Sequence, residues 1–396
     1  MNNPVGYFQE IYGRFSARTC SEAIVYFLIG VAHVFWGVRF ADSQFLGLST
    51  LPVLLTVQFA AYLSGVLVTP ILAKFADLRA FVPISIGMYC LAICVGATSW
   101  SMVLLLGSSL LLGLMAGMQE TIIAAAVLAD RGRRQQIFIL EKFFGLGAFT
   151  FPFFVALTDV SDLFYLYGIC ICILAIVALG LWISSDIGEA GHSAVSEVPR
   201  LKTRYQSDRS QTKKSMLFTL MVVALFYGGF ETNFVNWLPA FGSHSGGNAI
   251  GEIAISLFWV GIVVGRLVIN LALSRFSTGF LLFVSGVALT VFVFVLGLSL
   301  NITHRFWLYV LILIIGLSSS VIFPGLLSYA AGKVHVDTAR VTSALVSSAT
   351  LGGSVCAMPF GFIVSNFGER SLCLVFAVLG VLAILLMYST TIVRRH

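Results

Sequence analysis

Four ionisable side chains lie within long apolar runs of the sequence, where a charged group is costly. They are His33, Glu120, Glu231 and Arg266. Carboxyl and imidazole groups can take up and release a proton, and a guanidinium group can pair with a carboxylate. If these runs cross a bilayer, each charge costs about 3 kcal/mol or more, so each group needs a partner, a water-filled cavity or a function. These residues are therefore the first candidates for chemistry.

Glu120 is the predicted site of proton coupling. It precedes Asp130 by ten residues. At a rise of about 1.5 Å per residue, its carboxyl group lies about 15 Å from the end of the apolar run. A carboxyl group at this depth favours its neutral form, and a substrate or a nearby cation can tip the balance either way. The alternative is a neutral carboxyl group that forms a hydrogen bond to a neighbouring helix.

The other three groups each have alternatives that the sequence leaves open. Glu231 either accepts hydrogen bonds from substrate hydroxyl groups or balances the charge of Arg266. For Arg266 itself we predict a structural ion pair with a carboxylate, or an interaction with a helix end. His33 either relays protons or is a neutral imidazole bonded to a neighbouring helix.

Polar and aromatic residues near these groups indicate the class of ligand. Amides and carboxylates can bridge adjacent hydroxyl groups, and an aromatic face can cover the apolar face of a ring. The mixture predicts a site for a small polyhydroxy solute. The predicted substrate-binding residues are Gln119, Glu231, Asn233, His33 and Trp237.

Glu141 lies at the beginning of another apolar run. It stands one turn into that run, beside Lys142 and close to the basic segment "DRGRR". A carboxylate at this place either forms the ion pair of an inner gate or is simply solvated at the membrane interface. The sequence favours neither alternative.

The composition requires a membrane around these residues. The chain has 396 residues, of which 59% are hydrophobic and only 10% are charged. A water-soluble globule could not hide so much apolar surface. Runs of roughly 20 apolar residues are long enough to cross a bilayer core about 30 Å thick. We therefore predict an all-α membrane protein with twelve transmembrane helices, approximately at 22–42, 50–73, 81–99, 101–127, 137–157, 162–184, 215–239, 251–274, 279–299, 305–328, 341–365 and 371–391.

The twelve predicted helices form two similar halves. "FLIGVAH", which ends at His33, aligns with "LFYGGFE", which ends at Glu231. "GLGAFTFP" at 145–152 likewise aligns with "GGSVCAMP" at 352–359. We predict a duplicated, pseudo-symmetric pair of six-helix bundles in which His33 and Glu231 face each other across a pseudo-twofold axis. The predicted parts are an N-terminal bundle at 1–184, a cytoplasmic linker at 185–214 and a C-terminal bundle at 215–396.

The distribution of Lys and Arg predicts the orientation in the membrane. These residues stay preferentially on the cytoplasmic side. With both termini inside, the outer segments hold only Arg39, Arg305 and Arg370 of the 23 Lys and Arg residues. We predict a multi-pass protein of the plasma membrane with both termini in the cytoplasm and no removable signal peptide. The net charge of +6 then reflects orientation and not nucleic-acid binding.

Several classes of chemistry are not supported. The seven cysteines are scattered, mostly within predicted helices, which favours free thiols over disulfides or a metal site. The chain carries no HExxH zinc pair, no GxSxG nucleophile elbow and no Walker loop. We therefore expect no enzyme activity, no cofactor and no bound metal.

Four stretches resemble a known family. They are "QETIIAAAV", "LEKFFGLGAFTFP", "GGFETNFVNWLP" and "SLFWVGIVVGRL". With them the chain resembles the major facilitator superfamily and, within it, the fucose/glucose:proton symporter group, particularly bacterial glucose/mannose:proton symporters. The resemblance implies that Glu120 takes part in proton coupling and that Glu231 and Asn233 line the substrate site. Of the superfamily's gating motif after the second helix, the chain keeps Asp77 and Arg79.

The sequence thus predicts a secondary active transporter. We expect proton-coupled uptake of a hexose or a related small polar solute by alternating access, in a lipid bilayer and as a monomer. The alternative is a proton-driven exporter of a drug or a small metabolite, such as an amino sugar or a peptide antibiotic. A membrane sensor without transport is less well supported, because the linker contains no recognisable signalling domain.

Overall fold

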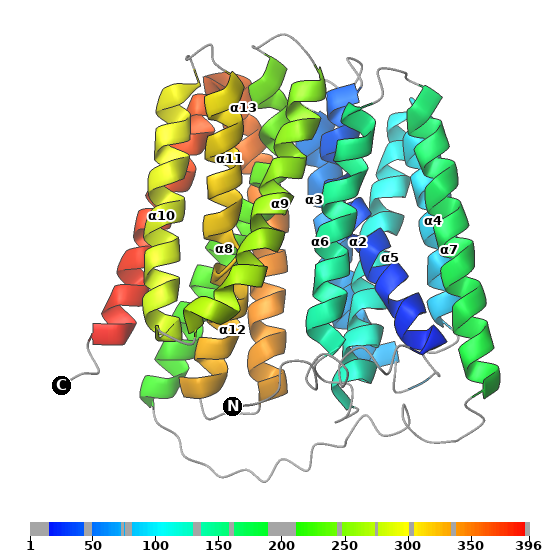
Figure 1. Ribbon diagram of the computed structural model, residues 1–396, viewed down its shortest axis with the longest axis horizontal. Coiled ribbons are helices and arrows are strands. Elements are labelled where there is room, and N and C mark those ends of the chain that lie inside the picture. Colours follow the sequence, from blue (N-terminus) through cyan, green and yellow to red (C-terminus); the bar gives the residue numbers. More distant parts are fainter. Residues whose placement is uncertain are drawn as a thin grey trace. The chain divides into compact units, whose positions relative to one another are not determined.

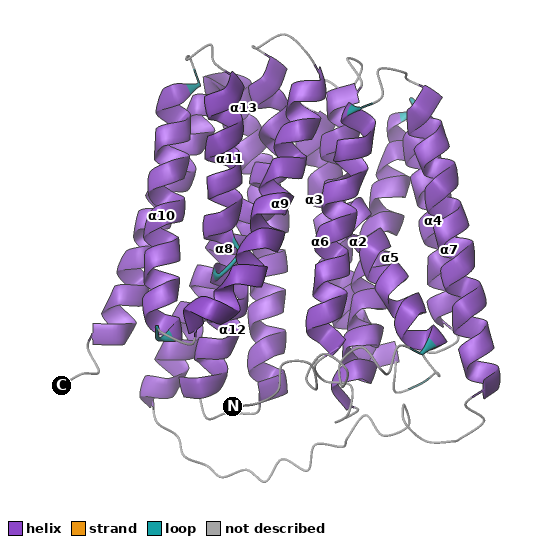
Figure 2. Cartoon of the chain, in the orientation of Figure 1, coloured by secondary structure: helices purple, strands orange, loops and turns teal. Residues whose placement is uncertain are grey.

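A computed structural model describes residues 16–42, 50–72, 75, 81–129, 136–157, 162–188, 211–243, 248–273, 276–300, 305–333 and 338–392. Apart from short turns, these residues are helical, and no strand occurs among them (Figure 2). The helices are α2 (Ala17–Asp42), α3 (Thr50–Leu72), α4 (Phe81–Thr98), α5 (Met102–Ala129), α6 (Gln136–Ala156), α7 (Asp162–Gly188), α8 (Gln211–Ser243), α9 (Asn248–Leu273), α10 (Thr278–Ser299), α11 (Arg305–Ser319), α12 (Ile322–Lys333) and α13 (Thr338–Ile392). The prediction of an all-α protein is confirmed.

The lengths and apolar composition of these helices suit a bilayer. Within the described part of the chain, nine helices are long and apolar enough to cross a membrane, and a shorter apolar segment covers Gly168–Ile183. One of the nine, Ser343–Ser389, is 47 residues long and covers two of the predicted spans.

One predicted span in the C-terminal half differs from the structure. The predicted helix at 305–328 is divided into α11 and α12 (Figure 1). Pro324 explains the division, because proline cannot donate to the carbonyl of Ser320 and its ring clashes with that carbonyl in a continuous helix. The label α13 covers two helical segments that meet at a non-helical residue, Gly368, whose φ of 77° is accessible to glycine. This break agrees with the predicted separation of the helices at 341–365 and 371–391.

The chain forms two compact units. The first unit comprises residues 1–33, 61–148 and 160–205, and the second comprises residues 34–60, 149–159 and 206–396. In the first unit α4 packs against α5 and α7, and in the second α8 packs against α13 and α9. The predicted division of the chain at residues 184 and 215 stays a prediction.

Small residues bring helices close together in the same way in both units. In the first unit a Cβ on Gly30 would lie 2.0 Å from the Phe144 carbonyl oxygen. In the second unit a Cβ on Gly228 would lie 2.1 Å from the Ala349 carbonyl oxygen. Gly30 and Gly228 occupy the same position in the aligned stretches "FLIGVAH" and "LFYGGFE". Such close approach of backbones is typical of helices packed within membranes.

The second aligned pair of stretches is shifted by two residues in the structure. Gly147 packs on the Phe27 carbonyl, and Gly352 packs on the Leu225 carbonyl. Since Phe27 and Leu225 are equivalent in the first alignment, the equivalent glycines of α6 and α13 are Gly147 and Gly352. The sequence alignment had instead paired Gly352 with residue 145.

Candidate functional site

A cluster of acidic and phenolic groups surrounds Glu120 in the first unit. The Tyr62 hydroxyl of α3 donates a hydrogen bond to the Glu120 carboxylate of α5. Close packing of the two helices makes this contact possible, because a Cβ on Gly117 would lie 2.2 Å from the Tyr62 carbonyl oxygen. Glu141 of α6 is half-buried and lies within electrostatic reach of Glu120. The structure thus brings together two acids that lie on different predicted helices.

Gln119 and His33 lie in the same unit. Gln119 is buried, and its Nε2 donates to the Ser85 hydroxyl at 3.1 Å. Its other polar atom, Oε1, is buried and has no hydrogen-bond partner among the described residues. His33 is half-buried and packs edge-on against Phe144, with ring centroids 5.4 Å apart.

Glu231 lies beside a tyrosine in the second unit. The Tyr227 hydroxyl is 2.9 Å from Glu231 Oε1, one turn away on α8, and 3.0 Å from the carbonyl oxygen of Ser319 at the end of α11. Tyr227 also interacts electrostatically with Arg266 of α9. The predicted residues Glu231 and Arg266 therefore act on the same hydroxyl group, whichever of the two predicted roles Glu231 has.

Asn233 and Trp237 are fully buried further along α8. Asn233 Nδ2 donates to the carbonyls of Gly229 at 2.9 Å and Gly353 at 3.1 Å. Asn233 Oδ1 and Trp237 Nε1 are buried and lack hydrogen-bond partners in the described part of the chain. A buried acceptor and a buried donor of this kind are stabilised when a water molecule or a ligand forms a hydrogen bond with them.

The second unit also contains parts of α2, α3 and α6. The Gly37 amide of α2 donates to Asn236 Oδ1 of α8 at 3.0 Å, and the Ser256 hydroxyl of α9 donates to the Phe149 carbonyl of α6 at 3.3 Å. A Cβ on Gly37 would lie 2.8 Å from that Oδ1 atom, so glycine permits the contact. These contacts join the C-terminal end of α2 and the middle of α6 to α8 and α9.

Three features of the structure were not predicted from the sequence. Arg18 and Glu22 form a buried ion pair at 3.3 Å, with the Arg18 guanidinium 5.3 Å from the Trp182 ring centroid. Opposite charges four residues apart on a helix could have indicated this pair. The same spacing relates Tyr227 to Glu231. Tyr62 had no local signal, since it is 58 positions from Glu120 in the chain.

Two predicted residues cannot be placed. Asp77 and Arg79 lie outside the described residues. All seven cysteines are described and are free thiols, with the sulfur atoms of Cys94 and Cys172 3.6 Å apart.

Buried polar groups on apolar helices are typical of membrane transporters, and the sequence matches a family of such proteins. The profile of the Major Facilitator Superfamily matches residues 15–345. The chain belongs to this superfamily. It is a multi-pass membrane transporter of a small-molecule substrate and not an enzyme.

This major facilitator protein is similar in sequence to a bacterial sugar transporter. It shares 27% identity over 386 residues with the "Glucose/mannose transporter GlcP" of Bacillus subtilis (strain 168), and the match covers 93% of each chain. The resemblance named from the four stretches is confirmed.

Solved structures of the superfamily share the fold. The xylose transporter XylE from E. coli superposes with a TM-score of 0.72 at 13% identity, over 94% of this chain and 97% of the other. FucP in its outward conformation superposes with a TM-score of 0.59 at 15% identity, over 94% and 98%. The predicted major facilitator fold is confirmed.

Proposed function

We propose that this transporter takes up a hexose, or a related small polar solute, together with a proton by alternating access. The observation that carries the substrate class is that each unit holds buried polar atoms with no hydrogen-bond partner among the described residues: Gln119 Oε1 in the first unit, and Asn233 Oδ1 and Trp237 Nε1 in the second. Two of these atoms accept hydrogen bonds and one donates, and the hydroxyl group of a sugar can do both. The similarity to a glucose/mannose transporter supports the same class.

The energy of these contacts suits a substrate that binds and leaves. A buried polar group without a partner costs about 1–3 kcal/mol, and a sugar hydroxyl that bonds to it recovers much of that cost. The fully buried ring of Trp237 adds an aromatic surface beside Asn233 on the same helix. Glu231 supplies a further acceptor one half-turn before Asn233, and Arg266 of α9 interacts electrostatically with Tyr227, which donates to Glu231.

Proton coupling is assigned to Glu120. Glu120 and Glu141 lie within electrostatic reach of each other, and two carboxylates in this situation repel. A proton on one of them relieves the repulsion, and the Tyr62 hydroxyl can stabilise the carboxylate that remains. We propose that the protonated, substrate-loaded carrier changes conformation and that the deprotonated empty carrier does not.

The available driving force is sufficient for accumulation. A proton that crosses with a potential of about 100 mV and a gradient of about one pH unit delivers roughly 2.3 plus 1.4 kcal/mol. This free energy supports a concentration ratio of roughly several hundredfold for a stoichiometry of one. We further propose that the chain works as a monomer in the plasma membrane, with both termini in the cytoplasm and the two predicted bundles moving against each other.

Transport by the purified full chain in proteoliposomes tests this function. Labelled D-glucose should accumulate when the external pH is lowered and a negative internal potential is imposed, and a proton ionophore should abolish the accumulation. Unlabelled mannose should compete. Absence of glucose uptake and of glucose binding, together with drug resistance in cells that express the chain, would support the alternative of export instead.

A further inference from the structure

We infer that Tyr227 is a positioning residue that links Glu231 to the interruption between α11 and α12. Binding of a substrate hydroxyl to Glu231 would then change the hydrogen bonding of that interruption. The inference rests on the proposed role of Glu231 in substrate binding. It adds that a substrate bound to Glu231 changes the hydrogen bonding at the end of α11 without touching α11 itself.

The hydroxyl of Tyr227 has two competing acceptors. It lies 2.9 Å from Glu231 Oε1 and 3.0 Å from the Ser319 carbonyl oxygen. A phenol has one proton and can donate it fully to only one acceptor at a time. The two acceptors belong to different elements, because Glu231 is on α8 and Ser319 is the last residue of α11. The position of one proton therefore distinguishes two states.

The interruption depends on outside donors. The last carbonyl groups of a helix lack donors from their own helix. Ser319 ends α11, and two turn residues separate it from the beginning of α12 at Ile322. Side chains supply donors here, because the Ser320 hydroxyl donates back to the Leu317 carbonyl at 2.7 Å and the Tyr227 hydroxyl donates to the Ser319 carbonyl at 3.0 Å. Loss of the Tyr227 bond should weaken the end of α11.

α9 packs against the same interruption between α11 and α12. A Cβ on Gly265 would lie 2.2 Å from the Ser320 hydroxyl oxygen, so α9 and the turn are in close contact at this point. The next residue on α9, Arg266, interacts electrostatically with Tyr227. The charges of Glu231 and Arg266 thus both influence the hydroxyl group that bonds to Ser319.

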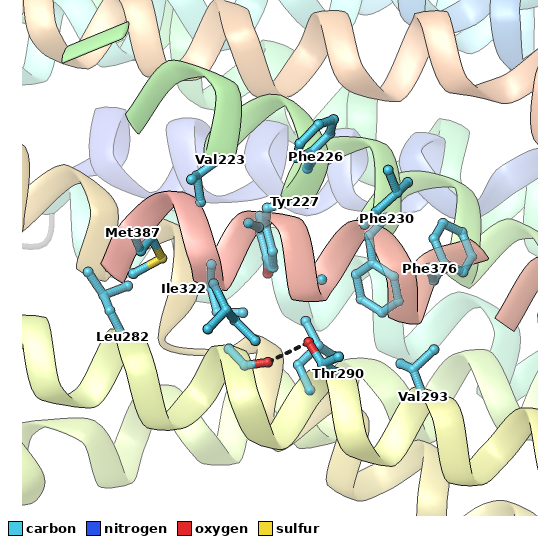
Figure 3. A pocket seen from close by; sticks show the side chains of 16 residues that line it. Val223, Phe226, Tyr227, Phe230, Leu282, Thr290, Val293, Ile322, Phe376 and Met387 are labelled. Atoms are coloured by element: carbon cyan, nitrogen blue, oxygen red, sulfur yellow. Dashed lines mark hydrogen bonds between the residues drawn. The ribbon is translucent and has the colours of Figure 1, made fainter. Parts of the chain in front are cut away.

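A cavity beside Tyr227 gives these groups room to move. Its volume is about 60 Å³, and Tyr227, Phe230, Thr290, Ile322 and Phe376 are among the residues that line it (Figure 3). Ile322 is the first residue of α12, so the ring of Tyr227 and the beginning of α12 border the same unfilled space. Small shifts of either one do not require other side chains to repack, because the space is already open.

Substrate binding should move the proton of Tyr227 towards Ser319. A carboxylate attracts a hydroxyl donor more strongly than a neutral carbonyl does. In the empty carrier, Glu231 therefore competes well for the Tyr227 proton. When a sugar hydroxyl donates to Glu231, the hydrogen bond from Tyr227 to Glu231 weakens. The hydrogen bond from Tyr227 to the Ser319 carbonyl becomes stronger. The end of α11 becomes more stable, and amides at the interruption open less often.

Hydrogen exchange of the full-length protein in detergent tests the inference. D-Glucose should slow the exchange of the backbone amides between Ser320 and Gly325 by about two- to tenfold, the effect of one hydrogen bond. Tyr227→Phe should still bind glucose but should lose this slowing. Tyr89→Phe is the matched control, because it removes another buried hydroxyl that donates to a helix carbonyl, that of Leu28, within the first unit, whereas the interruption between α11 and α12 belongs to the second unit. The control should keep the slowing.

A second comparison requires no sugar and separates the inference from the proposed function. Glu231→Gln replaces a charged acceptor by a weaker neutral one, so it should slow exchange between Ser320 and Gly325 in the wild-type background but not in Tyr227→Phe. If glucose fails to bind to the wild type, the proposed function is wrong, yet this comparison still decides the inference. Equal effects of Glu231→Gln in both backgrounds, or an unchanged response to glucose in Tyr227→Phe, would overturn it.

Discussion

Tyrosine hydroxyl groups donate hydrogen bonds to Glu120 and Glu231, the two acids that we assign to transport. Tyr62 donates to Glu120 in the first unit, and Tyr227 donates to Glu231 in the second. A phenol can stabilise a carboxylate without adding a charge to the membrane interior, where a lysine or arginine would be costly. The two acids differ in their further surroundings, since Glu120 has Glu141 within reach and Glu231 shares its tyrosine with Arg266. This difference supports a proton role for the first and a substrate role for the second.

Replacement of Glu120 should separate proton coupling from substrate movement. In Glu120→Gln the amide cannot release a proton, so the accumulation ratio should fall from roughly several hundredfold to about one. Counterflow exchange of labelled for unlabelled glucose should continue, because it needs no net proton transfer. Both are measured in proteoliposomes. If the variant still accumulates glucose fully, the proton site lies elsewhere, and the buried Glu22 is the next residue to replace.

Replacement of Asn233 should weaken substrate binding. Asn233→Ala removes the buried Oδ1 acceptor, and loss of one such bond costs about 1–3 kcal/mol, which is roughly five- to 150-fold in affinity. Asn366→Ala is a matched control, because Asn366 on α13 is exposed and donates to the Phe362 carbonyl at 2.8 Å in the same four-residue pattern. Isothermal titration with glucose measures both. Equal affinities in the two variants would remove Asn233 from the site.

Pairs of helices pack closely where a glycine of one helix lies against the backbone of the other. α2 meets α6 through Gly30 and Gly147, and α8 meets α13 through Gly228 and Gly352. Each glycine faces a carbonyl oxygen of the opposite helix at a distance that leaves no space for a side chain. Without a hydrophobic force between helices inside lipid, such close packing is a main source of association.

A methyl group at Gly352 should therefore destabilise the second unit. Its Cβ would lie 1.9 Å from the Leu225 carbonyl oxygen, and overpacking of this kind costs about 1–3 kcal/mol. Gly180→Ala on α7 is the control, because a Cβ there meets no atom of the described residues within 4 Å. In detergent, Gly352→Ala should melt several degrees below the wild type, whereas the control should melt at or above it. Similar melting of both variants would contradict the close contact.

Orientation belongs to the scale of the whole molecule. The excess of Lys and Arg in alternate segments predicts cytoplasmic termini and a cytoplasmic linker. A membrane-impermeant maleimide on intact cells should label Ser101→Cys at the beginning of α5 but should label Ser196→Cys in the linker only after the cells are opened. The native cysteines of the wild type provide the background. The opposite pattern of labelling would invert the predicted topology, and with it the assignment of uptake.

Much of this protein could be predicted from its sequence because membrane burial follows from local composition. The ranges of α3, α4, α9 and α10 agree with the predicted spans to within a few residues. Glu120, Glu231 and Arg266 stood out for the same reason, since an ionisable group in an apolar run is rare and costly. Pro324 could also have indicated the break between α11 and α12, but the residues at 305–328 are apolar throughout and were therefore predicted as one helix.

The sequence by itself determined the class of protein and its polar candidates, because apolar length and buried charge are properties of single segments. Only the tertiary structure decided which groups of different helices meet: Tyr62 with Glu120, Tyr227 with Ser319, and Gly352 with Leu225. No local pattern encodes the distance between these partners, whereas Tyr227 and Glu231 meet through the four-residue spacing of one helix. The choice of Tyr62 as the donor to Glu120 is therefore a property of the packing and not of any one helix.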